Sequence, residues 1–376
     1  MKETRVIISG GGTGGHIFPA VSIANAIKEI RPDAKILFVG AEGRMEMQRI
    51  PAAGYKIKGL PVRGLIRPLW NPGNIGVLLD FLKSKRMVRK TIRDFKPQVA
   101  VGVGGYASAA TLNAAYEMGI PCLIQEQNSF AGLTNKTLAR KARKICVAYE
   151  GMERFFPKEN IMLTGNPVRQ ELCSDITREE AAKTFGIDPQ KPTILLIGGS
   201  LGARTLNNSV LSALNIIGKS NVQFIWQTGG YYKDTINKEL EEKEKPENLF
   251  VYDFIKDMDK AYRIADLVIS RAGASSISEL CLLGKPSILV PSPNVSEDHQ
   301  THNAMALVNR DAAIIVRDAE AEEKLIPMAL QTVSDKMKLG TLGTNARKMA
   351  LLDSARIIAE EVLKLADETE RKHIKT

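Results

Sequence analysis

The sequence predicts an α/β protein made of two doubly wound, parallel-sheet domains. The chain has 376 residues, a length that favours two domains over one. A short apolar strand, a glycine turn and a helical segment occur in that order twice, beginning at residues 5 and 193. The composition, 44% hydrophobic and 25% charged, is typical of a globular chain and excludes a disordered or fibrous one.

The elements follow one another in the same order in each half. In the first half, a strand over residues 5–9 precedes the glycine turn 10–16 and a helix over 17–30. In the second half, a strand over 193–197 precedes the glycine turn 198–204 and another helix. Because strands alternate with helices, we expect parallel sheets. Further strands are predicted over residues 35–39, 99–103, 122–125, 145–147, 222–226, 267–270 and 287–290.

The domain boundary is predicted near residue 166, where a Gly-Asn-Pro turn precedes a charged, variable stretch. Apolar residues at helical spacing near the C-terminus, among them Ile357 and Val362, predict a last helix that can pack on either domain, including back on the first. The first domain is expected to cover residues 1–166 and the second domain residues 167–349. The last helix is expected at about residues 350–376.

Charge is distributed unevenly between the two halves. Residues 1–166 carry 25 Lys and Arg against 12 Asp and Glu, a net charge of +13, whereas the remainder carries 27 against 30. A strongly basic half suggests that it meets an anionic surface: a membrane, a nucleic acid or a phosphorylated substrate.

Cysteine usage and hydropathy exclude several classes of protein. Four cysteines without a CxxC pair predict buried, reduced thiols at Cys122, Cys146, Cys173 and Cys281. No secretory signal is recognisable at the N-terminus. The uncharged stretch 97–116 is interrupted by glycines, which favours a strand, turn and helix over a membrane span.

The predicted helix over residues 75–95 has an apolar stripe flanked by basic residues. Trp70 and Arg67 precede it. Two interpretations stay open from periodicity alone: a monotopic contact with anionic lipid, or an ordinary amphipathic helix with a solvated basic face. The stripe comprises Leu78, Phe81, Leu82, Val88, Ile92 and Phe95, and the basic residues are Lys83, Lys85, Arg86, Arg89, Lys90 and Arg93.

Glycine turns follow three predicted strands, at residues 10–15, 102–105 and 198–202. The first contains GxGxxG, which alone is typical of a dinucleotide site with Glu42 on the ribose. His16 directly after it is unusual for that motif. Tight turns without a ligand are the alternative for any single one of these loops. Three such turns at the carboxyl ends of parallel strands favour binding of an anionic ligand.

Two polar segments in the second half add candidate ligands. Residues 270–279 place serines at a helix start and Glu279 one turn later, which fits either a phosphate and ribose site or a capping box. Residues 293–303 include His299 and His302, but no third ligand lies at zinc spacing, so no metal site is predicted. Asp257 and Asp259 are expected to start a helix.

These motifs together resemble the MurG family of bacterial transferases, which move N-acetylglucosamine from UDP-GlcNAc to lipid I, giving lipid II for peptidoglycan synthesis. The matching motifs run from residue 10 to residue 304, and the paired GGTGGH and GGSxGAR turns are the most specific. They comprise residues 11–16, 102–106, 125–128, 131–136, 165–169, 198–204, 271–279 and 298–304.

The resemblance implies a glycosyltransferase-B fold, with two Rossmann-like domains across a cleft, and a role for each motif. His16 is the candidate general base, and Gly104, Gly105 and Tyr106 would bind the acceptor pyrophosphate. Ile255 would contact the uracil through its backbone and Glu279 the ribose. The remaining implied donor-binding residues are Thr13, Gly14, Gly15, Asn128, Arg169, Ser200, Ala274, Ser275, Ser276 and Gln300.

The resemblance also implies partners and a location. We expect a hexosyltransferase of cell wall biogenesis that needs no cofactor and no metal, and that lies peripherally on the cytoplasmic face of the inner membrane. Expected partners are UDP-GlcNAc, lipid I, the anionic membrane surface and other cell-wall synthesis proteins, but no nucleic acid. The alternatives are a nicotinamide-dependent oxidoreductase, a transferase with another acceptor such as a diacylglycerol or a soluble aglycone, and a non-enzymatic binder.

Overall fold

The chain folds into two compact units. The computed structural model describes residues 3–64, 66, 68, 70–168, 172, 175–199 and 201–375, with the backbone alone at 296 and 372–375. Unit 1 comprises Met1–Val168 and Leu351–Thr376, and unit 2 comprises Arg169–Ala350. The chain therefore crosses between units close to residue 166, and its last helix belongs to unit 1.

Unit 1 is built on a sheet in which every described strand runs parallel to its neighbours, in the order β3-β2-β1-β4-β5-β6-β7. Strands β1 to β3 are added toward one edge of the sheet, and β4 to β7 are added toward the other, so the strand order reverses between β1 and β4. Ligands of such sheets bind at this point of reversal, beyond the carboxyl ends of the strands. The strands are β1 (Arg5–Ser9), β2 (Lys35–Ala41), β3 (Lys56–Leu60), β4 (Val99–Gly102), β5 (Cys122–Glu126), β6 (Lys144–Val147) and β7 (Ile161–Leu163).

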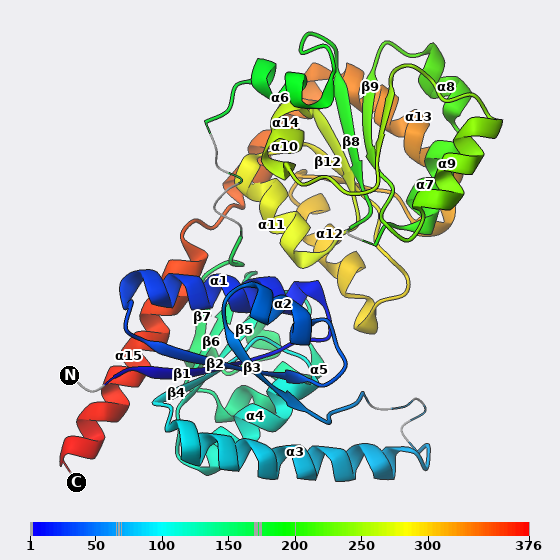
Figure 1. Ribbon diagram of the computed structural model, residues 1–376. Helices are drawn as coiled ribbons and strands as arrows, with labels where there is room; N and C mark the ends of the chain where they lie inside the picture. Colours follow the sequence, from blue (N-terminus) through cyan, green and yellow to red (C-terminus); the bar gives the residue numbers. More distant parts are fainter. Residues whose placement is uncertain are drawn as a thin grey trace. The chain divides into compact units, whose positions relative to one another are not determined.

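Helices cover both faces of this sheet, and alternate residues of β1 show how. Val6 and Ile8 belong to the core that includes Ile23 and Ile358, whereas Ile7 belongs to the core that includes Val88. Figure 1 accordingly shows α1 and α3 on opposite faces. The helices of unit 1 are α1 (Gly14–Ile30), α2 (Glu46–Ala52), α3 (Asn74–Phe95), α4 (Tyr106–Glu117), α5 (Leu133–Leu138) and α15 (Ser354–Lys375), with 3₁₀ turns at Ala139–Lys141, Met152–Arg154 and Lys158–Asn160.

Unit 2 repeats the design with a parallel sheet in the order β10-β9-β8-β11-β12-β13, which reverses between β8 and β11. Its strands are β8 (Thr193–Ile197), β9 (Gln223–Gln227), β10 (Leu249–Tyr252), β11 (Leu267–Ser270), β12 (Ser287–Leu289) and β13 (Ile314–Ile315). Its helices are α6 (Arg178–Phe185), α7 (Arg204–Leu211), α8 (Leu214–Lys219), α9 (Lys233–Glu242), α10 (Met258–Ile264), α11 (Ala274–Leu283), α12 (His299–Val308), α13 (Ala321–Ser334) and α14 (Lys336–Lys348), with 3₁₀ turns at Ser296–Asp298 and Asp318–Glu320.

The predicted α/β class and parallel sheets are confirmed, and every predicted strand is present. Residues 97–116 form β4 and α4 with a glycine turn between them, as expected. Among the helices of the described residues, none is both long and apolar enough to cross a membrane. Cys122, Cys146 and Cys281 are buried free thiols, and burial raises the pKa of each to about 12. Cys173 lies outside the described residues.

Candidate active site

The glycine turn after β1 holds the imidazole of His16. Helix α1 begins at Gly14, and its N-cap residue, Thr13, makes no side-chain capping bond. The His16 Nδ1 atom lies 2.9 Å from the Gly11 carbonyl oxygen and 3.5 Å from the Thr13 hydroxyl. Because a carbonyl only accepts hydrogen bonds, the Nδ1 atom carries a proton and donates it to Gly11. The Nε2 atom of the neutral ring is therefore the proton acceptor.

A buried carboxylate that no sequence motif indicates lies beneath this turn. Glu46, at the start of α2, accepts hydrogen bonds from the Gly12 N–H at 3.0 Å and the Ala41 N–H at 3.0 Å. A carboxylate repels phosphate, and it consumes an N–H group that a dinucleotide would need. The geometry therefore argues against the oxidoreductase alternative, in which Glu42 would hold a ribose.

The turn after β4 packs against His16. Gly104 and Gly105 both adopt positive φ, 104° and 85°, which non-glycine residues rarely adopt. A Cβ atom at Gly104 would lie 2.7 Å from the His16 Nε2 atom, so the backbone there faces the imidazole directly. Tyr106 begins α4, and its phenol lies against Gly64. The structure thus brings together the predicted base and the predicted acceptor-binding turn within unit 1.

The loop after β5 is organised by another buried carboxylate. Glu126 accepts hydrogen bonds from the Asn128 N–H at 3.0 Å, the Gly132 N–H at 3.1 Å and the Asn135 side chain at 2.9 Å. The Asn128 side chain also donates to Glu126, at 3.2 Å. Glu126 therefore fixes the conformation of the loop that presents Asn128 at the carboxyl edge of the sheet.

In unit 2, the turn after β11 presents backbone N–H groups and serines. Helix α11 begins at Ala274, and its first main-chain bond is donated by Ile277 to Gly273. The N–H groups of Ala274, Ser275 and Ser276 thus precede the helical ladder and are suited to an anion. The capping-box alternative is wrong, because Gly273 is the N-cap residue and no side chain caps the helix.

Glu279 is buried on α11 and is oriented by a tyrosine. Its Oε2 atom accepts a hydrogen bond from the Tyr262 hydroxyl at 3.0 Å. Tyr262 itself is buried on α10. The sequence indicated Glu279 through its spacing from the serines, but it gave no sign of Tyr262, which lies 17 residues away in the chain.

The predicted helix start at Asp257 is confirmed, although the Asp257 side chain makes no capping bond.

The predicted uracil contact, Ile255, has its N–H group engaged. It donates to the Gln227 Oε1 atom at 2.9 Å, while the Gln227 side-chain nitrogen donates to the Gly199 carbonyl at 3.0 Å. Gln227 therefore ties the glycine turn after β8 to the loop after β10. A bound base would have to compete with Gln227 for this N–H.

The loop before α12 has an unusual backbone. Glu297 and Asp298 both adopt positive φ, at 53° and 50°, although neither is glycine. Such strain persists only where the surroundings impose it, and it concentrates at functional sites. The Gln300 Oε1 atom accepts a hydrogen bond from the Ser292 N–H at 2.9 Å, which fixes the start of α12 to the loop after β12.

An ion pair links two of these loops in unit 2. The Arg271 guanidinium lies 2.5 Å from the Asp318 carboxylate, and it also donates to the carbonyls of Val290 and Pro291. Asp318 also accepts from the Thr205 hydroxyl at 2.9 Å. The starts of α7 and α11 are thereby held in a fixed relation.

The candidate residues divide between the units. Unit 1 contributes His16, the acceptor turn and part of the donor set, and unit 2 contributes the rest. Arg169 and Ser200 lie outside the described residues. Within the part of the chain that the structure describes, no three His, Cys, Asp or Glu side chains gather as metal ligands. That the protein needs no cofactor and no metal stays a prediction.

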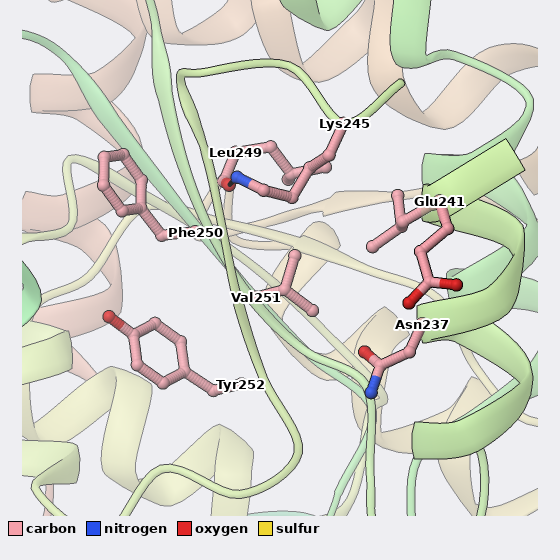
Figure 2. A pocket seen from close by; sticks show the side chains of 8 residues that line it. Asn237, Glu241, Lys245, Leu249, Phe250, Val251 and Tyr252 are labelled. Atoms are coloured by element: carbon pink, nitrogen blue, oxygen red, sulfur yellow. Dashed lines mark hydrogen bonds between the residues drawn. The ribbon is translucent and has the colours of Figure 1, made fainter. Parts of the chain in front are cut away.

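An open hollow of about 530 Å³ lies apart from these loops, between α9 and the edge strand β10 (Figure 2). Phe250 and Tyr252 extend to one side of the strand, while Asn237 and Glu241 reach toward it from α9 (Figure 2). The Lys245 ammonium donates to the Leu249 carbonyl at 2.9 Å and so covers part of the strand edge. No candidate residue lines this hollow, and we assign it no part in the site.

Two doubly wound units, each with polar loops at the point where its sheet reverses, are typical of proteins that bind nucleotides beyond the carboxyl ends of their strands. The chain belongs to glycosyltransferase family 28: residues 6–147 match the family 28 N-terminal domain and residues 193–361 match the C-terminal domain. The family resemblance and the glycosyltransferase-B fold are confirmed.

Named relatives agree with this assignment. The chain is 63% identical to a Bacteroides fragilis protein over 97% of its own length and 96% of the relative's, and 52% identical to a Porphyromonas gingivalis protein over 98% and 97%. Both carry the name UDP-N-acetylglucosamine–N-acetylmuramyl-(pentapeptide) pyrophosphoryl-undecaprenol N-acetylglucosamine transferase. A crystal structure of MurG from Acinetobacter baumannii matches with a TM-score of 0.78 at 29% identity, over 96% of this chain and 99% of that one.

Proposed function

We propose that the chain transfers N-acetylglucosamine from UDP-GlcNAc to the 4-hydroxyl of the N-acetylmuramic acid in lipid I, which yields lipid II. The observation that carries this proposal is the 63% identity to a transferase of that name across almost the whole chain. The loops described above carry groups of the kinds that such a transfer needs.

The chemistry requires a base and a stabilised leaving group. The acceptor oxygen bonds to the anomeric carbon with inversion, the bond from that carbon to the diphosphate breaks, and UDP leaves with the electron pair. His16 is the proposed base, because the bond from Nδ1 to Gly11 leaves the Nε2 atom of the neutral tautomer to take a proton from the 4-hydroxyl. Gly104 faces that nitrogen, and Gly105 and Tyr106 follow Gly104 at the start of α4. We assign all three to the acceptor pyrophosphate.

The donor is assigned mainly to unit 2. The free N–H groups at Ala274, Ser275 and Ser276 can stabilise the charge that develops on UDP. Glu279, held by Tyr262, would accept from the ribose hydroxyls, and Ile255 would face the uracil. The other residues assigned to the donor are Arg169 and Ser200 for the nucleotide, Gln300 and Asn128 for the sugar, and Thr13, Gly14 and Gly15 from unit 1.

The acceptor is lipid-linked, and α3 offers a surface suited to a membrane. Ile75, Leu78, Leu79 and Leu82 form one exposed apolar stripe in its first half, and Trp70 just before it is 85% exposed. The sequence placed Leu78 and Leu82 on the same stripe as Val88 and Ile92. The structure divides this stripe, because Val88 and Ile92 are buried. We propose that the exposed half inserts at the surface of the anionic inner leaflet, on the cytoplasmic face.

The basic residues of α3 are not equivalent. Lys85 and Arg89 lie 2.6 and 2.5 Å from Glu117, so their charges are already paired. These two cations lower the pKa of Glu117, the hydrogen bond from Lys85 most of all. Lys83, Arg86 and Lys90 are exposed. The membrane contact is therefore expected to depend on exposed basic residues such as these three rather than on Lys85 or Arg89.

Vesicle binding tests this surface. Changing Lys83, Arg86 and Lys90 together to Glu should release the protein from anionic vesicles, because about 1 kcal/mol is lost for each basic residue near the surface. The matched control changes three exposed basic residues elsewhere in unit 1, Arg49, Lys56 and Lys158, to Glu. Equal loss of co-sedimentation in both triple variants would contradict a localised membrane face.

Transfer of radiolabelled sugar tests the reaction itself. Incubation with labelled UDP-GlcNAc and a lipid I analogue should give a labelled disaccharide lipid. Parallel reactions with a diacylglycerol and with a soluble aglycone address the acceptor alternatives. Labelling of either of these, with none of the lipid I analogue, would contradict the proposal.

A further inference from the structure

One peptide group in unit 1 is held from both sides. The Gly12 N–H donates to the Glu46 carboxylate at 3.0 Å, and the Gly11 carbonyl accepts from the His16 imidazole at 2.9 Å. These two atoms belong to the single peptide unit that joins Gly11 to Gly12. The carboxylate and the imidazole are therefore connected through one planar, polarisable group.

The surroundings are shaped for the carboxylate. Glu46 is completely buried, and its second oxygen accepts from the Ala41 N–H at 3.0 Å. A Cβ atom at Gly11 would lie 2.1 Å from the Glu46 Oε1 atom, and one at Gly40 would lie 2.7 Å from its Cγ atom. Both glycines thus leave the room that Glu46 occupies. Each of the two carboxyl oxygens thus accepts from one main-chain N–H group.

We propose that Glu46 is a positioning residue for His16, acting through the Gly11–Gly12 peptide. Its charge polarises the peptide, which strengthens the acceptor capacity of the Gly11 carbonyl toward the Nδ1 proton. The ring is then held with the Nε2 atom unprotonated and facing Gly104. The same dipole stabilises the imidazolium that forms when Nε2 takes a proton. A buried aspartate does this directly in a Ser-His-Asp triad, and here one peptide group is interposed.

This inference deepens the proposed function, because its kinetic consequence rests on His16 as the base. An alternative is that Glu46 only stabilises the fold of the turn. In that case the protonation pattern of the His16 ring would not depend on Glu46. The two interpretations therefore differ in a spectroscopic property and not only in stability.

The test compares Glu46→Gln with Glu42→Gln in the full chain. Glutamine is nearly isosteric with glutamate, but its one carbonyl oxygen cannot replace a carboxylate that accepts from Gly12 and Ala41 separately. Glu42 precedes Glu46 in the same loop and is exposed, so its variant makes the same charge change without touching the peptide. The measurements are kcat, the donor KM, the melting temperature and the ¹⁵N spectrum of the histidine rings, with His16 assigned from a His16→Ala spectrum.

We expect Glu46→Gln to lower kcat between about 10- and 100-fold, while the donor KM stays within about twofold. Its His16 ring should lose the pure Nδ1-protonated pattern, and Glu42→Gln should match the unmodified protein in every measurement. An unchanged kcat and ring pattern in folded Glu46→Gln would overturn the inference. A fall in kcat that only follows the loss of folded protein, with the ring pattern kept, would overturn it as well.

Two further outcomes keep this inference separate from the proposed function. If Glu46→Gln does not fold, the unmodified protein still decides, because a His16 ring protonated at Nε2 would overturn the inference without any variant. If His16→Ala keeps full turnover, the assignment of the base is wrong. The ring pattern of Glu46→Gln then still decides whether Glu46 positions His16.

Discussion

The two glycine turns that look most alike in the sequence differ in what lies beneath them. In unit 1, the turn after β1 has the buried carboxylate of Glu46 against its Gly12 N–H. In unit 2, the turn after β8 has the neutral amide of Gln227, which donates to the Gly199 carbonyl. In the first turn an N–H group donates to an internal carboxylate, whereas in the second turn a carbonyl accepts from a neutral amide.

This difference supports the proposed division of chemistry between the two turns. A turn beneath which a carboxylate is buried disfavours phosphate but can orient an imidazole and stabilise its positive charge. A turn supported by a neutral amide, next to the serine-rich start of α11, suits a nucleotide diphosphate. Similar glycine patterns therefore specify similar backbone turns, while the residue packed below decides which charge each turn accepts.

The largest expected effect concerns the first turn. His16→Ala should lower kcat between about 10²- and 10⁴-fold, because it removes the proposed base. UDP binding, measured by calorimetry, should change little, since the diphosphate is assigned to the start of α11 in unit 2. Full turnover in His16→Ala would contradict the role given to the first turn.

The next effect concerns the donor side. Glu279→Ala should weaken UDP-GlcNAc binding between about 10- and 100-fold, because hydrogen bonds to a charged group contribute about 1.5–3 kcal/mol. Tyr262→Phe removes only the hydroxyl that orients Glu279, so it should weaken binding about fivefold. If the two changes weakened UDP-GlcNAc binding equally, or if a folded Glu279→Ala variant bound UDP-GlcNAc as tightly as the unmodified protein, the ribose would have to bind elsewhere.

A third change makes the second turn resemble the first. Gln227→Glu places a carboxylate below the turn after β8 and removes the donor to Gly199, so we expect the donor KM to rise about tenfold. Gln223→Glu is the control, because Gln223 is buried at the opposite end of β9 and bonds to Asp188. Both variants should be less stable, but a raised donor KM in both would show that charge beneath the turn is not the cause.

The interior strands were predictable from the sequence because their apolar residues are continuous. The strands missed were β3, β7, β10 and β13, which are the outer strands of the two described sheets. Strand β3 carries Lys56 and Lys58, so it lacks the apolar run that marks a buried strand. The other three are apolar but only two to four residues long, which is too short for a pattern to distinguish them from a loop. The helix α1 begins at Gly14 rather than residue 17, since its first turn consists of glycines that local propensity disfavours.

The loops of the candidate site were predictable, but their supports were not. His16, Gly104 and Glu279 follow strands in recognisable motifs. Glu46 and Tyr262 support them from other elements, and nothing near them in the sequence indicates a partner 34 or 17 residues away. Such contacts arise from strand order, which local patterns do not encode.

A crystal structure with UDP bound tests most directly whether the donor binds the loops of unit 2 rather than the turn after β1. We expect the uracil at Ile255, the ribose at Glu279 and the diphosphate at the start of α11. Uridine diphosphate lodged against residues 10–16, with the start of α11 vacant, would contradict it.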